Sequence, residues 1–306
     1  MSLLGRLAAC WDEFFFVPVD VRFVDAFRIA YAALLFVDCA GYLPFVNMWW
    51  GVEGAVPFDV ARTLIDPDTL TIFTWLPRND TVLWVCFGIF AIQVLALLVG
   101  YKSRFQAICV YVWLVSFQHR LHLINDGEDT VLRIFGFLLI FLPIGRWLSI
   151  DSGARLSGPV QTAPAWALRL VQFQTVLVVF CAGWEKWLGT DWPAGTAMYY
   201  VTRLNDLFGR FPVPDAVLDS LPVLKAMSWS TLGLEIALPI LVWFRPITLP
   251  VVIVALGFHL TIDYQMNLFL FQWLMILGWL SFLATTDLEP WKRRFLRRGS
   301  PIPGQP

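Results

Sequence analysis

The chain has 306 residues, of which 58% are hydrophobic and 15% charged, and its mean hydropathy is +0.67. This composition excludes an ordinary soluble domain, which does not need so much apolar surface, and it predicts an integral membrane protein. The net charge of -1 identifies no partner by itself, because the charged residues cluster between apolar segments.

The chain divides by composition into a short N-terminal segment, a long apolar region and a basic tail. Residues 1–23 are predicted to form an amphipathic helix at the membrane interface, and 24–287 to form the transmembrane domain. About twenty apolar residues cross the hydrocarbon core, so runs of that length mark the spans. Eight such runs are present: Val24–Val46, Thr81–Gly100, Arg104–Ile124, Asp129–Leu148, Trp166–Trp187, Lys225–Phe244, Pro246–Tyr264 and Leu268–Ala284.

The predicted fold is therefore all-α, a polytopic transmembrane bundle of about eight spanning helices with two long external loops. Most lysines and arginines fall on one side if both termini are cytoplasmic, which predicts that orientation in a cell (inner) membrane. The basic tail, 288–306, is expected to contact anionic lipid headgroups rather than nucleic acid. Residues 47–80 and 188–224 form the external loops, which are rich in Trp, Pro, Gly and Asp.

Ionisable side chains inside apolar helices are costly unless they are paired or functional, so they mark candidate sites. The first candidate is Lys186, which ends the apolar run Ala182-Gly183-Trp184-Glu185-Lys186-Trp187 ahead of Asp191 and Trp192. A desolvated lysine has a lowered pKa and can act as a general base, which an arginine cannot do. The alternative is that Lys186 reaches the membrane interface or pairs with Glu185 or Asp191.

Two further candidates lie within the later helices. His259 and Asp263 are four residues apart and share a helix face, so Asp263 could orient the imidazole toward a ligand or both could serve packing. Glu235 falls near the middle of its helix, where it is expected to be protonated or paired, with Arg133 or Arg28 as candidate partners. Arg28 and Asp38 on the first helix are expected to pair with other helices.

A polar corner joins the third and fourth predicted spans. It contains Gln118, His119, Arg120 and His122, followed by the run Asn125-Asp126-Gly127-Glu128-Asp129. The carboxylates suit the start of a helix, where they accept from free backbone N–H groups. His119 and His122 match no metal-ligand spacing, so no metal site is predicted. His119, His122, Asn125 and Glu128 are instead candidate substrate-binding residues.

At these residues the chain resembles a known family, the horizontally transferred transmembrane (HTTM) domain proteins, which are related to the vitamin K-dependent gamma-glutamyl carboxylases. The resemblance extends from about Phe23 to Leu288. It is carried by Ala182-Gly183-x-x-Lys186 with Asp191-Trp192-x-x-Gly195, by Phe141-Leu142-Pro143 leading to Leu148-Ser149-Ile150-Asp151, and by Phe258-His259. Where the carboxylases carry Asn-His at the start of the fourth helix, this chain has Gly127-Glu128.

The resemblance implies a quinol-dependent enzyme. In the carboxylases the matching lysine deprotonates vitamin K hydroquinone, and reaction with oxygen then yields a base that prepares glutamate for carboxylation. By resemblance, Lys186 and His259 are the catalytic residues, a vitamin K-like quinol is the cofactor, and a peptide or protein is carboxylated or oxidised in a lyase-like or epoxidase-like reaction. Glu185, Asp191, Trp192, Glu128, Asn125, His119, His122 and Glu235 are expected to line the substrate site. The alternative function is a non-catalytic membrane subunit that binds a lipid, a peptide or a partner protein.

Overall fold

The computed structural model describes residues 3–63, 69–153 and 161–285, and nearly all of their regular structure is helical. This confirms the predicted all-α, polytopic fold class. Within the described residues, four helical segments are long and apolar enough to cross a membrane by length and composition: Val21–Trp50, Asp80–Val99, Trp166–Leu188 and Arg245–Gln265. The other predicted spans also coincide with helices, but these are shorter or more polar, and the number of eight spans stays a prediction. The basic tail lies outside the described residues.

The chain forms two compact units. Unit 1 comprises Met1–Val171 with Leu268–Leu277, and unit 2 comprises Gln172–Asn267 with Gly278–Pro306. The helices and strands that lie wholly in the first segment of unit 1 are α1 (Leu3–Phe15), β1 (Pro18–Asp20), α2 (Val21–Tyr42), α3 (Val46–Trp50), α4 (Phe58–Thr63), α5 (Asp80–Val99), α6 (Ser103–Arg120), α7 (Gly127–Leu139) and β2 (Thr162–Pro164). Short 3-10 turns lie at Leu43–Phe45, Ile72–Thr74 and His122–Ile124, and β1 pairs antiparallel with β2.

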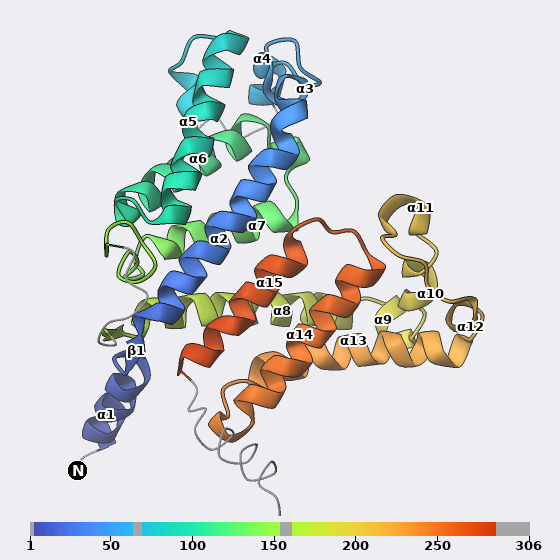
Figure 1. Cartoon of the computed structure of the whole chain (residues 1–306). Coiled ribbons are helices and arrows are strands. Elements are labelled where there is room, and N and C mark those ends of the chain that lie inside the picture. Colours follow the sequence, from blue (N-terminus) through green and yellow to red (C-terminus); the bar gives the residue numbers. More distant parts are fainter. Residues whose placement is uncertain (1–2, 64–68, 154–160, 286–306) are drawn as a thin grey trace, which may run out of the picture. The chain divides into compact units, whose positions relative to one another are not determined.

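Helix α2 is central to unit 1 and packs against α5 and α7, while α6 packs against both α5 and α7 (Figure 1). One polar contact ties α2 to α7, since the buried hydroxyl of Tyr31 donates to the Leu132 carbonyl at 2.9 Å. Gly136 makes this approach possible, because a Cβ at that position would lie 2.5 Å from the Tyr31 hydroxyl oxygen. The contact keeps a buried hydroxyl satisfied without a charged partner.

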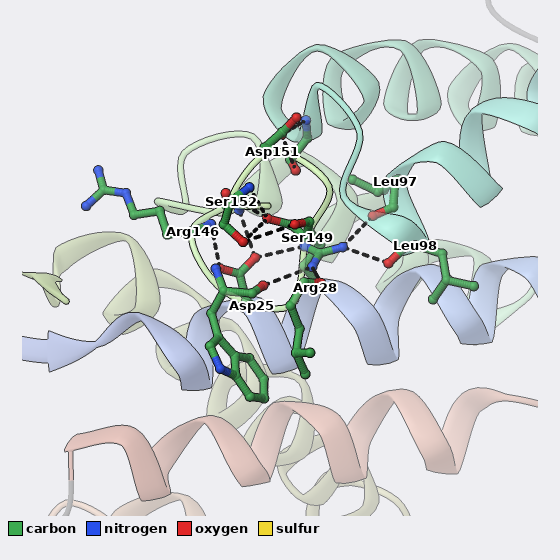
Figure 2. Close-up of polar contacts among 12 residues, drawn as sticks. Asp25, Arg28, Leu97, Leu98, Arg146, Ser149, Asp151 and Ser152 are labelled. Atoms are coloured by element: carbon green, nitrogen blue, oxygen red, sulfur yellow. Dashed lines mark hydrogen bonds and ion pairs between the residues drawn. The ribbon is translucent and has the colours of Figure 1, made fainter. Parts of the chain in front are cut away.

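A buried network of Asp25 and Arg28 holds three segments of unit 1 together (Figure 2). Arg28 donates through Nε to Asp25 at 2.8 Å, and both side chains are 0% exposed. The guanidinium also donates to the carbonyls of Leu97 and Leu98 at the end of α5, and to that of Leu148. The Asp25 carboxylate in turn accepts from the backbone N–H groups of residues 145, 146 and 147. Every charge in the network therefore has hydrogen-bond partners, as burial demands.

The fourth predicted span is wrong at its C-terminal end. Helix α7 ends at Leu139 rather than Leu148, and a series of turns follows to residue 153. Pro143 disfavours a helical conformation in the residue before it, Gly145 adopts a φ of 83°, and Asp25 binds the N–H groups that a longer helix would use. Apolar composition alone did not reveal this break.

The turns after α7 supply the N-terminal cap of α6. Asp151 accepts from the N–H of Lys102 at 2.7 Å, and from the N–H and hydroxyl of Ser103 at 2.8 Å. Its partial burial acts to raise the pKa, but these hydrogen bonds outweigh burial and hold the pKa of Asp151 below its ordinary value. The carboxylate is thus stabilised in its charged form at the start of a helix.

Unit 2 contains most of α8 (Trp166–Leu188), the whole of α13 (Leu221–Leu241) and α14 (Thr248–Gln265), and the end of α15 (Phe271–Leu280). The long loop before α13 is not irregular. It holds the short helices α9 (Asp191–Ala194), α10 (Ala197–Val201), α11 (Asn205–Phe208) and α12 (Asp215–Leu218), and 3-10 turns lie at Arg245–Ile247 and Ser281–Thr285. Helices α9, α10 and α12 pack on α13, so the loop forms a structured layer beside that helix.

Candidate functional site

Lys186 lies at the end of α8 and forms an ion pair with Glu235 of α13. The Lys186 Nζ is 2.8 Å from Oε1 and 2.7 Å from Oε2 of Glu235. The side chain of Lys186 is 24% exposed and that of Glu235 only 9%. The ring of Trp192, in α9, lies 5.3 Å from the amine. The structure therefore brings three predicted site residues together in unit 2, from three different helices.

Gly183 explains how the carboxylate reaches the lysine. It lies one turn before Lys186 on α8, and a Cβ there would be 2.8 Å from the Cβ of Glu235 and 3.1 Å from its carbonyl carbon. Only a residue without a side chain allows α8 and α13 to approach this closely. The Ala-Gly-x-x-Lys motif thus has a physical basis, because the glycine admits Glu235 and the lysine neutralises its charge.

The predicted ion-pair partners of Glu235 and Lys186 were wrong. Glu235 pairs with Lys186 and not with Arg133 or Arg28, and Lys186 has neither Glu185 nor Asp191 as its ion-pair partner. Glu185 is exposed, and the exposed Asp191 accepts from the Thr196 hydroxyl at 3.1 Å within its own loop. The reason is geometric. Gly183 and Lys186 lie on the face of α8 that contacts α13, whereas Glu185 lies on another face of the helix.

His259 is buried in unit 2, but its observed partner is not Asp263. The indole N–H of Trp279 donates to His259 Nε2 at 3.0 Å, so this nitrogen is the acceptor. Asp263 instead forms an ion pair at 2.8 Å with Arg210, which lies in the loop between α11 and α12. The expectation that Asp263 orients the imidazole finds no support in these contacts, whereas the indole constrains the ring and its tautomer.

The polar corner of unit 1 is organised mainly as a helix start. Asp126 and Asp129 form a capping box at the N-terminus of α7, which confirms the predicted capping role of this acidic run. The side chain of Gln118 donates to Asp129, and Asn125 donates to the Gln118 carbonyl. Glu128 does not cap α7 with its own side chain, since its carboxylate accepts from the Leu270 N–H at 2.8 Å.

The two histidines of this corner differ in their surroundings. His119 Nδ1 lies 2.8 Å from the Leu70 carbonyl, and its Nε2 lies 3.4 Å from Arg133, whereas His122 is exposed. The predicted site residues consequently divide between two groups. His119, Asn125 and Glu128 share the polar corner of unit 1, whereas Lys186, Glu235 and Trp192 form a cluster in unit 2.

Several residues that shape these surroundings were not singled out from sequence. Trp279 and Arg210 supply the partners of His259 and Asp263 from 20 and 53 residues away, so local spacing could not reveal them. Asp25 could have been found, because it precedes Arg28 by three residues and therefore shares its helix face.

Comparison with family models gives a match to the HTTM domain over residues 16–286. The chain belongs to the HTTM domain family. The match covers the Lys186 cluster, His259 and the polar corner, and it relates the chain at family level to the membrane domain of the vitamin K-dependent carboxylases. Comparison with curated proteins and with solved structures gives no match. The HTTM domain thus identifies the chain as a membrane protein and does not specify a reaction.

Proposed function

We propose that this HTTM domain protein is a membrane-embedded enzyme that acts on a lipid-soluble quinol, with the amine of Lys186 as proton acceptor. The observation that carries the proposal is the Lys186–Glu235 ion pair, at 2.7 Å, which two apolar helices hold beside Trp192. Membrane-embedded charges of this kind are costly and commonly mark functional sites. The position of the lysine within Ala-Gly-x-x-Lys supports the same role.

The pair can accept a proton as a unit. Desolvation disfavours two separated charges, so transfer of one proton from the Lys186 ammonium to Glu235 yields a neutral amine and a neutral carboxylic acid. The free amine then takes a proton at Nζ, and the pair ends as an ammonium beside a protonated Glu235. An arginine could not perform this exchange, because its guanidinium keeps its proton.

The surroundings of the pair fit a molecule with a ring and an apolar tail. A groove of about 270 Å³ runs along α8 and α13 and is lined entirely by apolar side chains: Phe173, Val176, Leu177, Phe180, Pro239 and Ile240. Pro239 lies four residues beyond Glu235, which is about 6 Å along a helix, so the groove begins close to the ion pair. The indole of Trp192 offers a face for an aromatic ring. A bound quinol would supply an ionisable hydroxyl and two reducing equivalents.

The oxidant and the partner substrate are inferred from the family resemblance. Molecular oxygen would be the oxidant, and a peptide or protein partner would be the substrate that is carboxylated or oxidised. His259, held by Trp279, would complete the catalytic set, and Glu185, Asp191 and Trp192 would contact substrate within unit 2. His119, His122, Asn125 and Glu128 remain candidate substrate-binding residues of unit 1. We place the protein in the cell membrane, with both termini in the cytoplasm, on the distribution of its basic residues.

The test is quinol oxidation by purified full-length protein in lipid nanodiscs, followed by oxygen consumption. Lys186→Ala and Lys186→Arg should each lower the rate by about 100-fold or more, the usual contribution of a general base. Lys225→Ala is the matched control, because Lys225 is also a lysine beside an indole, with Nζ 4.9 Å from the Trp229 ring. Full activity in Lys186→Ala would reject catalysis and favour the alternative of a binding subunit.

A further inference from the structure

A pocket of about 100 Å³ lies in unit 1 beside the first turn of α5, and the residues that line it include neither Lys186, His259 nor any of the candidate substrate-binding residues. Three aromatic side chains line it, Trp50, Phe58 and Phe73, together with aliphatic residues and prolines. Two arginines also line it, Arg78 from the loop before α5 and Arg120 from the end of α6. The pocket therefore combines apolar walls with guanidinium groups, a pairing that suits an amphipathic anion.

Arg120 is a buried charged residue of this pocket that has a nitrogen without a hydrogen-bond acceptor in the described structure. The residue is 5% exposed, its Nη2 donates to the Trp50 carbonyl at 3.2 Å, and its guanidinium carbon lies 4.7 Å from the centre of the Phe58 ring. Its Nη1 is buried and has no hydrogen-bond partner among residues 3–63, 69–153 and 161–285. A guanidinium cannot neutralise itself by losing a proton, so this buried donor needs an acceptor.

The other charges of the pocket are already engaged. Arg78 forms an ion pair with Asp59 at 2.6 Å. Asp80 accepts from the Val52 N–H at 2.9 Å, and it also faces the positive end of the α5 dipole as the first residue of that helix. Arg120 is thus the cation in this pocket with no ion-pair partner in the described part of the chain. The pocket can compensate one negative charge.

The position of the pocket along α5 indicates which anion could supply the negative charge that Arg120 lacks. Helix α5 is a candidate membrane span that begins at Asp80, so its first turn lies at the boundary between hydrocarbon and headgroups. Phospholipid phosphates occupy this level, and a phosphodiester carries one negative charge with two free oxygens. We propose that this pocket binds the phosphodiester of a phospholipid headgroup, with Arg120 Nη1 donating to a phosphate oxygen and the aromatic wall contacting the glycerol and upper acyl chain.

The experiment uses delipidated full-length protein and native mass spectrometry. The protein is titrated with dioleoylphosphatidylglycerol, with dioleoylglycerol, which lacks the phosphate, and with inorganic phosphate. The wild type should bind the first phosphatidylglycerol at least about tenfold more tightly than dioleoylglycerol, as loss of one charge-assisted hydrogen bond implies. Equal affinity for the two lipids, or equal occupancy by inorganic phosphate alone, would overturn the proposal without any mutant.

A variant pair then assigns the site. Arg120→Gln should lower the affinity for the first phosphatidylglycerol about tenfold while leaving dioleoylglycerol binding unchanged. Arg203→Gln is the matched control, because Arg203 also stacks on a ring, 3.7 Å from the Tyr199 centre, and also donates to backbone carbonyls. A similar loss in both variants, or no loss in Arg120→Gln, would rule out this pocket as the site.

Discussion

Replacement of Asp25 by asparagine should strongly destabilise unit 1. Asp25 accepts three backbone N–H bonds from residues 145–147 and one bond from Arg28, and both side chains are 0% exposed. Asparagine keeps the shape but removes the charge, and its amide NH₂ would face N–H donors. The substitution leaves the buried guanidinium of Arg28 without a carboxylate, which lowers the free energy of unfolding by about 3–5 kcal/mol.

The measurement is the apparent melting temperature in detergent, followed by tryptophan fluorescence. At roughly 2–4 °C per kcal/mol, that cost corresponds to a decrease of about 6–20 °C. Asp20→Asn is the matched control. Asp20 forms an exposed ion pair with Arg22 and caps α2, and asparagine can still cap, so this variant should lose less than about 1 kcal/mol. Equal melting temperatures for wild type and Asp25→Asn would refute the argument that the buried carboxylate compensates Arg28.

Two further predictions concern stability. Gly183→Ala should lower the melting temperature by the equivalent of about 1–3 kcal/mol through overpacking against Glu235, whereas Gly233→Ala on α13, where a Cβ meets open space, should leave it equal or higher. A lower value in Gly233→Ala than in Gly183→Ala would contradict this. Asp151→Asn should lose stability at neutral pH, and because the folded pKa of Asp151 lies below its ordinary value, the difference from wild type should be constant above about pH 4 and shrink as the pH falls further. Melting curves from pH 3 to 7 test this, and a difference that grows toward low pH would have the wrong sign.

Much of the helical framework could be predicted from hydropathy. The start of α8 at Trp166 and the extent of α5 agree with the apolar runs, since lipid-facing and buried positions are both apolar there. The end of α7 could not be predicted this way. The residues that stop it include Asp25, which is 120 residues from Gly145 in the sequence, and no local pattern reports such a contact.

The candidate site was predictable to a smaller extent. Lys186 stood out because a charge at the end of an apolar helix is unusual, and Glu235 stood out for a similar reason. Their pairing was not anticipated, because the two residues are 49 positions apart and the contact depends on the missing side chain of Gly183. The unpaired Nη1 of Arg120 could not be predicted from the sequence either, because only the folded chain shows which nitrogen lacks an acceptor.

Among the described residues, the hydrogen-bond acceptors of Arg28 outside its own helix are main-chain oxygens, at Leu97, Leu98, Trp147 and Leu148. A main-chain acceptor is present whatever side chain its residue carries. Substitutions at these four positions should therefore leave the guanidinium satisfied as long as the backbone keeps its course. In a saturation library, the half-buried positions Leu98 and Trp147 should tolerate more substitutions than Arg28 and Asp25, so the network constrains the path of the chain more than the side chains at these acceptor positions.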